Sequence, residues 1–139
     1  MPTAKGKAVN CFGLFTRDNR SWTALSRDSL TSEYVIEQLE RFAGELRKLT
    51  VVVLDNAPIH RTKEVAKRMI GWSERGLFIF YLPKASPHLN LAETVWRKLK
   101  YEWLAPTDYE SQEQLRYAVW LALKAFGTDL RIQFSDFKV

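Results

Sequence analysis

The sequence predicts an α/β fold in which helices flank a mixed β-sheet. Two β-prone runs separated by a polar break come first, and helical repeats then alternate with short apolar runs. A hairpin followed by alternating strands and helices is the pattern of an α/β sheet with two parallel crossovers. With 139 residues and 46% hydrophobic content, the chain is sized for one domain with a real core.

The first predicted element is a β-hairpin. Residues 7–15 are β-prone, and a polar break at 17–20 separates them from a second strand at 22–25. Cys11 lies inside the first of these strands. Because the chain has one cysteine, no internal disulfide is expected, and its position favours a buried structural thiol over a catalytic one.

An amphipathic helix is the next predicted element. Its apolar residues recur at helical spacing and are Val35, Leu39, Phe42, Leu46 and Leu49. Either Thr31 or Ser32 is suited to cap its N-terminus, because a hydroxyl oxygen can accept a hydrogen bond from an early helical N–H group. Residues 50–54 are β-branched or leucine, which predicts a strand that is buried on both faces.

A second pair of helix and strand follows. Thr62 is the predicted N-cap of the helix, and the apolar residues that share one helical side are Val65, Met69 and Trp72. Gly76 is a natural stop, because glycine readily adopts the left-handed conformation that ends many helices. Residues 77–82 then predict another buried strand.

The last part of the chain predicts two more helices. The first starts at Asn90, and its apolar stripe consists of Trp96, Leu99 and Trp103, so these side chains are expected in the core rather than on a base-stacking surface. The second starts after Ser111, which has capping-box spacing to Gln114, and ends at Gly127. Its apolar residues are Leu115, Ala118, Val119, Ala122 and Phe126. The alternating residues 130–134 predict an additional strand.

Two acidic residues stand at the ends of predicted elements. Asp55 follows the strand at 50–54, and Glu93 lies in the first turn of the helix that starts at Asn90. This arrangement can bring both carboxylates to one edge of the sheet, where they can hold a divalent cation against a phosphodiester. A metal-dependent nucleic-acid enzyme is therefore the first hypothesis.

The sequence blocks around these acids resemble the catalytic core of the DDE/DDD transposases, specifically the mariner superfamily and related bacterial insertion-sequence transposases. The first block is Asp-Asn-Ala-x-x-His at 55–60, and the second runs from Leu-Pro at 82–83 to Leu-Lys at 99–100. The resemblance implies an RNase H-like mixed sheet flanked by helices. It also implies that Asp55 is the second and Glu93 the third catalytic acid, and that both are ligands of Mg²⁺ or Mn²⁺.

The chain departs from the family pattern in two places. Leu91 stands where the family usually has a proline, and the family's first catalytic Asp, on a strand that precedes the stretch matched by 7–15, has no match here. The resemblance therefore implies a single, partial catalytic domain over 1–139 that lacks its first strand and ends in a tail at 128–139. Because the absent strand is central in that fold, exposed strand edges are expected to pair with each other, with another copy or with the missing N-terminal segment.

The resemblance also implies roles for residues beside the two acids. The residues expected to support the site are Asn56, His60 and Asn90, and those expected to contact DNA are Lys84, Arg97 and Lys100. Lys100 follows Glu93 by seven residues, which is nearly two α-helical turns, so the two are expected on about the same face.

Each acid also has a structural interpretation. Asp55 starts an Asp-Asn-Ala-Pro stretch that is good turn chemistry, and Asn90 with Glu93 has the spacing of a capping box. Arg97 can pair with Glu93 at the next turn, and Lys100 can be an ordinary solvated lysine. Only the metal-site interpretation requires both carboxylates to converge on one cation.

The overall charge agrees with a polyanionic partner, because 21 basic and 16 acidic residues give a net charge of +5. No apolar run is long enough to cross a membrane and no signal peptide is evident, so a cytoplasmic location is expected. The chain is expected to be the C-terminal part of a core that cleaves and joins DNA when complete, and to have little activity alone. The alternatives are an inactive remnant or accessory protein that binds DNA or oligomerises, and another RNase H-like nuclease such as a resolvase.

Overall fold

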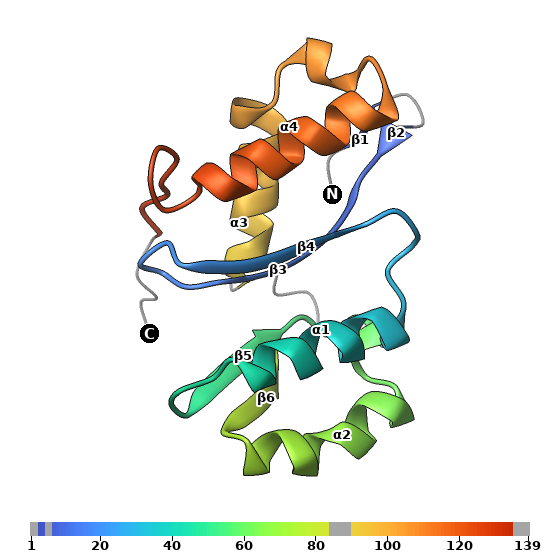
Figure 1. The fold of residues 1–139 in the computed structure, drawn as a ribbon, viewed down its shortest axis with the longest axis vertical. Coiled ribbons are helices and arrows are strands. Elements are labelled where there is room, and N and C mark those ends of the chain that lie inside the picture. Colours follow the sequence, from blue (N-terminus) through green and yellow to red (C-terminus); the bar gives the residue numbers. More distant parts are fainter. Residues whose placement is uncertain (1–2, 5–6, 84–89, 135–139) are drawn as a thin grey trace. The chain divides into compact units, whose positions relative to one another are not determined.

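The computed structural model describes residues 3–4, 7–83 and 90–134, which form a mixed α/β structure (Figure 1). The strands are β1 (Thr3–Ala4), β2 (Lys7–Ala8), β3 (Asn10–Phe15), β4 (Ser21–Ser26), β5 (Thr50–Leu54) and β6 (Leu77–Tyr81). The α-helices are α1 (Ser32–Gly44), α2 (Lys63–Glu74), α3 (Leu91–Lys98) and α4 (Gln112–Ala125). Shorter helical turns are η1 (Pro58–His60), η3 (Leu99–Trp103) and η4 (Pro106–Tyr109). The predicted α/β class is confirmed.

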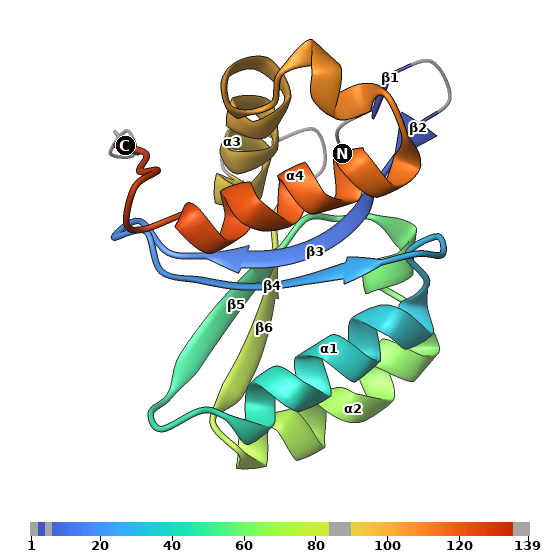
Figure 2. The same cartoon turned by 45° about the horizontal axis from the view of Figure 1, so that its top comes forward.

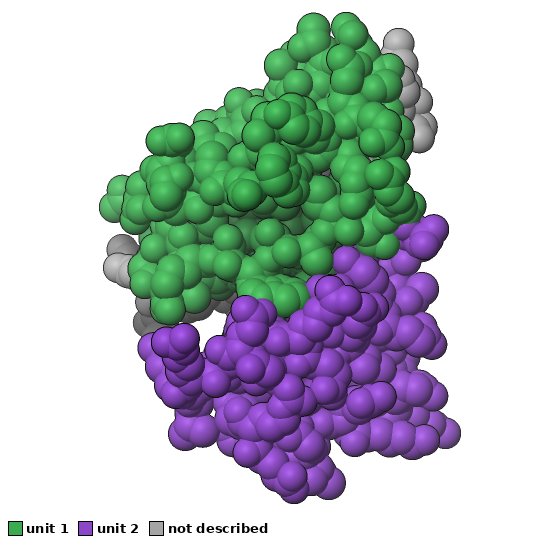
Figure 3. Space-filling view, in the orientation of Figure 1, with its two compact units in different colours: residues 1–27, 91–139 green, residues 28–90 purple. Residues whose placement is uncertain are grey.

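The chain divides into two compact units (Figure 3). Unit 1 comprises Met1–Arg27 and Leu91–Val139, whereas unit 2 is the continuous stretch Asp28–Asn90. The antiparallel strand pairs belong to unit 1 and the parallel pair belongs to unit 2. Within the described ranges, none of the helices has both the length and the apolar character that a bilayer crossing requires.

The hairpin of unit 1 is formed by β3 and β4, as predicted. The two strands pair in antiparallel register along their whole length. Asn19 in the connecting turn has a φ of 66°, which asparagine tolerates better than most residues. The hairpin begins later than predicted, because Lys7–Ala8 is a separate short strand that pairs with Thr3–Ala4.

One hydrophobic cluster joins the hairpin to α3 and α4. Its buried members are Val9, Cys11, Val95, Leu99, Leu104, Leu115, Val119, Ala122, Leu123, Phe126 and Ile132. Phe15 packs edge-on against both Trp96 and Phe126, with ring centroids 5.4 Å apart in each pair. Trp96 therefore packs against the core, as its helical stripe predicted. Cys11 is 3% exposed, which confirms the expected buried thiol.

Helix α4 begins and ends where the capping signals predict. Ser111 Oγ accepts a hydrogen bond from the Gln114 backbone N–H at 3.0 Å, and Gly127 follows the helix with a φ of 93°. The strand predicted at 130–134 is wrong, because these residues form no ladder and contribute one isolated bridge, between Phe126 and Leu130.

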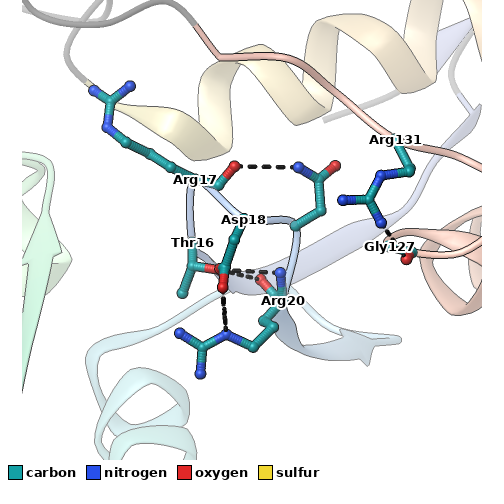
Figure 4. A network of polar contacts seen from close by, with 7 residues as sticks. Thr16, Arg17, Asp18, Arg20, Gly127 and Arg131 are labelled. Carbon is teal, nitrogen blue, oxygen red and sulfur yellow. Dashed lines mark hydrogen bonds and ion pairs between the residues drawn. The ribbon is translucent and has the colours of Figure 1, made fainter.

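The C-terminal stretch is held by the hairpin turn instead. The Asn19 side chain donates from Nδ2 to the Ile132 carbonyl at 2.8 Å and accepts from the Ile132 N–H at 2.6 Å. Figure 4 shows the turn at 16–20 with its internal hydrogen bonds and the Arg20–Asp18 ion pair. Nearby, Arg131 donates to the Gly127 carbonyl at 2.8 Å. A side-chain amide thus takes the place of a strand partner, and an alternating pattern cannot distinguish the two.

Unit 2 contains α1 and α2, and both helices are capped by predicted threonines. Thr31 Oγ1 accepts from the Tyr34 N–H at 3.1 Å, and Thr62 Oγ1 accepts from the Val65 N–H at 3.3 Å. Gly76, which follows α2, has a φ of 89°, the left-handed conformation expected of a glycine stop.

Helix α1 is shorter than predicted. It ends at Gly44, so Leu46 and Leu49 lie in the connection to β5 rather than in the helix, and Leu49 is 77% exposed. Two apolar residues that continue a helical spacing do not extend a helix unless they have a surface to pack against.

The strands β5 and β6 form a parallel pair. Thr50 pairs with Leu77 at one end and Leu54 with Tyr81 at the other, and α2 makes the crossover between them. One of the two predicted parallel crossovers is therefore confirmed. Figure 2 shows α1 and α2 next to each other on one side of this pair, and the helices contact each other.

The prediction that both strands of unit 2 are buried on both faces is wrong. Side chains of β5 alternate, so that Val52 and Leu54 are buried while Val51 is 63% exposed. The large apolar side chains on the exposed face are Val51, Val53, Phe78 and Phe80. A strand that is apolar at every position does not reveal which of its faces a helix covers.

Candidate functional site

Asp55 directly follows β5 and turns the chain towards η1. Its Oδ1 accepts a hydrogen bond from the Ala57 backbone N–H at 3.0 Å, which is the Asx turn that the local sequence indicates. Among the described residues, the second oxygen, Oδ2, has no hydrogen-bond partner. The side chain is 43% exposed, so an outside ligand can reach it. The turn and a metal ligand are therefore compatible interpretations of the same residue.

His60 fixes the Asp55 carboxylate from the other side of the loop. Its Nδ1 lies 2.9 Å from Asp55 Oδ1, and the imidazole is 14% exposed. Nδ1 also donates a hydrogen bond to the Asp55 backbone carbonyl at 3.3 Å, because a carbonyl oxygen can only accept. The histidine and the Asx turn thus both engage Oδ1, and they orient the carboxylate without using Oδ2.

Neighbouring residues brace this loop against β6. Arg61 Nη1 donates to Asn56 Oδ1 at 2.7 Å, and the Arg61 guanidinium lies 5.5 Å from the centroid of the Tyr81 ring. The Tyr81 hydroxyl donates to the His60 carbonyl, and burial raises the pKa of this hydroxyl. The tyrosine therefore keeps its proton for this bond at neutral pH.

Arg61 and Tyr81 were not among the residues expected at the site. The register of the parallel strands could have indicated that Tyr81 lies near the site, because Tyr81 pairs with Leu54, the residue before Asp55. Parallel strands end at the same edge of a sheet, so the last residue of one strand lies beside the loop that follows the other.

Glu93 lies in the first turn of α3, in unit 1. In the described part of the chain, no hydrogen bond or ion pair engages its carboxylate. Among the described residues Glu93 and Arg97 form no ion pair, so the alternative in which they pair is wrong. The carboxylate is partly exposed and available for a ligand.

The residues expected to contact DNA differ in their exposure and local conformation. Arg97 is exposed on α3, whereas Lys84 lies outside the described residues. Lys100 lies in η3, a π-helical turn closed by the Leu104 N–H and the Leu99 carbonyl at 3.0 Å. A π turn is wider than an α turn, so the helix that carries Glu93 is not regular up to Lys100. The Lys100 ammonium packs 5.4 Å from the centroid of the Tyr101 ring.

The chemistry of the two acids fits a hard divalent cation in part. Each carboxylate has oxygen atoms without protein partners among the described residues, and carboxylates are suited to Mg²⁺. Within 3–4, 7–83 and 90–134, however, no three His, Cys, Asp or Glu side chains are grouped around one point. The structure brings Asp55, Asn56 and His60 together in unit 2, while Glu93 belongs to unit 1.

Comparison with known proteins gives one match. The family model described as DDE superfamily endonuclease matches residues 1–116, which include both acids and most of the two units. No curated protein and no solved structure shows significant similarity to the chain.

Proposed function

Because the chain belongs to the DDE superfamily endonuclease family, we propose that it is part of a transposase core that cuts and joins DNA at phosphodiesters. The observation that carries this proposal is the way the Asp55 carboxylate is held. A loop hydrogen bond and His60 hold one carboxylate oxygen, and the other has no partner among the described residues. A carboxylate that is oriented in this way is prepared for a metal ion.

In the proposed site, Asp55 and Glu93 hold Mg²⁺ or Mn²⁺. When bound, such ions activate an oxygen nucleophile and stabilise the leaving oxygen of a phosphodiester. The residues around Asp55 act by positioning: His60 orients its carboxylate, and Arg61 with Asn56 stiffens the loop. A bracing role of this kind typically changes metal affinity by about 10- to 100-fold when it is removed.

DNA is the proposed substrate, held through its phosphates. Arg97 and Lys100 lie in the same stretch of chain as Glu93 and are exposed. Lys84, outside the described residues, lies in the same sequence block as Glu93 and is proposed as a further phosphate contact. The net charge of +5 supports attraction of a polyanion. The two sequence blocks also support a relationship to the mariner superfamily and to bacterial insertion-sequence transposases.

The proposed architecture is an RNase H-like sheet in which the β3–β4 hairpin and the β5–β6 pair are joined by a further strand. Each described pair has two strands, which leaves an edge on either side. We expect the joining strand and the third acid of the site to come from additional polypeptide, either an N-terminal segment or another copy of the chain. Asp55 and Glu93 alone would bind metal weakly.

A second candidate is an inactive remnant or accessory protein that binds DNA without cutting it. The observation that favours it is the absence of a three-ligand group among the described residues. Another RNase H-like nuclease, such as a resolvase, fits the fold class equally well, but the paired blocks at 55–60 and 82–100 favour a transposase.

Manganese titration of the chain, followed by electron paramagnetic resonance, tests the metal site. We expect Asp55→Asn and Glu93→Gln each to abolish the specific Mn²⁺ binding. Asparagine can still accept the Ala57 N–H bond, so the loop is retained in the first variant. Glu64→Gln is the matched control, because Glu64 is an exposed acid in the first turn of α2.

Mixing the chain with a polypeptide that supplies the third acid should produce nicking of a DNA duplex. The nicking should require Mg²⁺, Asp55 and Glu93. Equal Mn²⁺ affinity in the two site variants and the parent would rule out the metal site. Specific Mn²⁺ binding without nicking in the presence of the added segment would favour the remnant.

A further inference from the structure

A groove in unit 1, called here the α4 groove, lies between β4 and α4. It has a volume of about 590 Å³, and β4 and α4 contact each other directly. The side chains that give it its chemistry are Arg27, Glu113, Arg116, Tyr117, Trp120 and Lys124. All of them belong to unit 1, and none is part of the proposed metal site.

The α4 groove is positively charged. Arg27 Nη1 donates to Glu113 Oε1 at 2.9 Å, so this arginine neutralises the acid of the groove. Arg116 Nη2 donates to the Leu25 carbonyl at 3.4 Å, which holds its guanidinium at the β4 wall. Among the described residues, no acid pairs with Arg116 or Lys124. Two cations therefore remain for an anionic ligand.

The groove also presents a stack of exposed aromatic rings. Tyr117 and Trp120 are 61% and 44% exposed, their ring centroids are 6.1 Å apart, and their planes differ by 23°. The Lys124 ammonium lies 4.6 Å from the centroid of the Trp120 ring. Nearly parallel rings with a cation beside them form a platform on which a further flat ring can stack.

We propose that the α4 groove binds single-stranded nucleic acid. A base extends the stack on the exposed Tyr117 ring, while Arg116 and Lys124 meet backbone phosphates; this combination of aromatic platform and cationic groove is what single strands require. An acidic peptide would satisfy the cations but has no base to continue the stack. A second copy of the chain would bring the same cations and a net charge of +5. The proposal requires no metal and stands apart from the proposed function.

Fluorescence anisotropy with a labelled oligothymidine, measured on the full chain in EDTA, tests this. We expect binding that weakens with salt, and a loss of affinity of about tenfold for Tyr117→Ala and for Trp120→Ala. Trp120→Phe should retain most of the affinity, because a ring is preserved. Lys124→Gln should lower the salt dependence by about one phosphate contact.

Tyr101→Ala is the matched control, because Tyr101 is 72% exposed and has Lys100 over its ring but lies outside the groove. Its affinity for the oligothymidine should equal that of the parent, and so should that of Asp55→Asn. Equal affinities for the parent, Tyr117→Ala and Trp120→Ala would overturn the proposal. Displacement of the oligothymidine by polyglutamate at the same concentration of charges would also overturn it, because that result would identify the groove as a site for acidic peptides. If Asp55→Asn loses Mn²⁺ binding but keeps oligothymidine, the two sites are distinct.

Discussion

Single residues connect parts of unit 1 that are far apart in sequence. The Asn19 amide makes two bonds to the backbone of Ile132, and both partners are buried. The same residue adopts a φ of 66°, and its carbonyl lies 2.4 Å from where a Cβ on Gly127 would stand. Because Gly127 has a φ of 93°, this close approach needs glycine on both counts.

Replacing Asn19 separates its two contributions. We expect Asn19→Gly to lower the free energy of unfolding by about 2 kcal/mol, because the Ile132 N–H and carbonyl lose their partner while the left-handed turn is retained. Asn19→Ala should lower it by about 1 kcal/mol more, because alanine disfavours that φ. Urea denaturation measures both.

Arg20→Ala serves as the control for the turn, because its ion pair with Asp18 is exposed and should contribute little. An unfolding free energy that is the same for Asn19→Gly and Arg20→Ala would contradict the role given to the amide.

The Cys11 thiol gives unit 1 a pH-dependent stability. Burial raises the pKa of Cys11 from 9.0 to about 12, so the folded chain keeps a proton that the unfolded chain releases. The stabilising contribution is complete below the unfolded pKa of 9.0 and is lost as the pH rises towards the folded value of about 12. We expect the urea midpoint to fall between about pH 8 and about pH 10 more steeply for the parent than for Cys11→Ala.

Alkylation supplies an independent check on this thiol. At mildly alkaline pH, a maleimide should label Cys11 in urea and leave it largely unlabelled in the folded chain. Rapid labelling of the folded protein would show that the thiol is accessible and that burial does not raise its pKa.

At the scale of elements, the local sequence predicted where helices begin, but it did not predict which faces of the elements are buried. The Thr31, Thr62 and Ser111 caps were predictable, because each hydroxyl bonds an N–H within three residues of itself. The end of α1 and the exposed face of the β5–β6 pair were not predictable. Both depend on which neighbouring element packs against them, and the spacing of apolar residues carries no such information.

The helix that carries Glu93 makes the same point about the site. The sequence predicted one helix from Asn90 that carries Trp96, Leu99 and Trp103, but α3 ends at Lys98 and continues as the π turn η3. Leu99 at the start of that turn is fully buried in the core of unit 1. Leu104, which closes the turn, is also buried in this cluster.

At the scale of the whole molecule, the two units should behave as separate cooperative units. In unit 2, Glu40 accepts from Trp72 Nε1 at 2.7 Å and from Arg75 Nη1 at 2.8 Å. Burial raises the pKa of the Glu40 carboxyl, but these two hydrogen bonds and the charges of Arg75 and Arg68 together outweigh it, and the pKa lies below its ordinary value. The network therefore stabilises unit 2 at neutral pH and is lost as acid protonates Glu40.

Amide hydrogen exchange tests this separation. We expect Glu40→Gln to lower protection in α1, α2, β5 and β6 and to leave the amides of β3 and α4 unchanged, because no described bond of this network leaves unit 2. Asn19→Gly should do the reverse. Loss of protection throughout the chain in both variants would show one cooperative structure instead of two.

The order of the elements and the helix caps were determined by the sequence alone, as were the two blocks that carry Asp55 and Glu93, both of which lie inside the family match over 1–116. These features depend on contacts between near neighbours, or on residue types at set spacings. The bond from Asn19 to Ile132, the brace of Arg61 and Tyr81 beside Asp55, and the aromatic groove between β4 and α4 were decided by tertiary structure. Each joins residues that are distant in the chain, and such contacts exist only after the elements have packed.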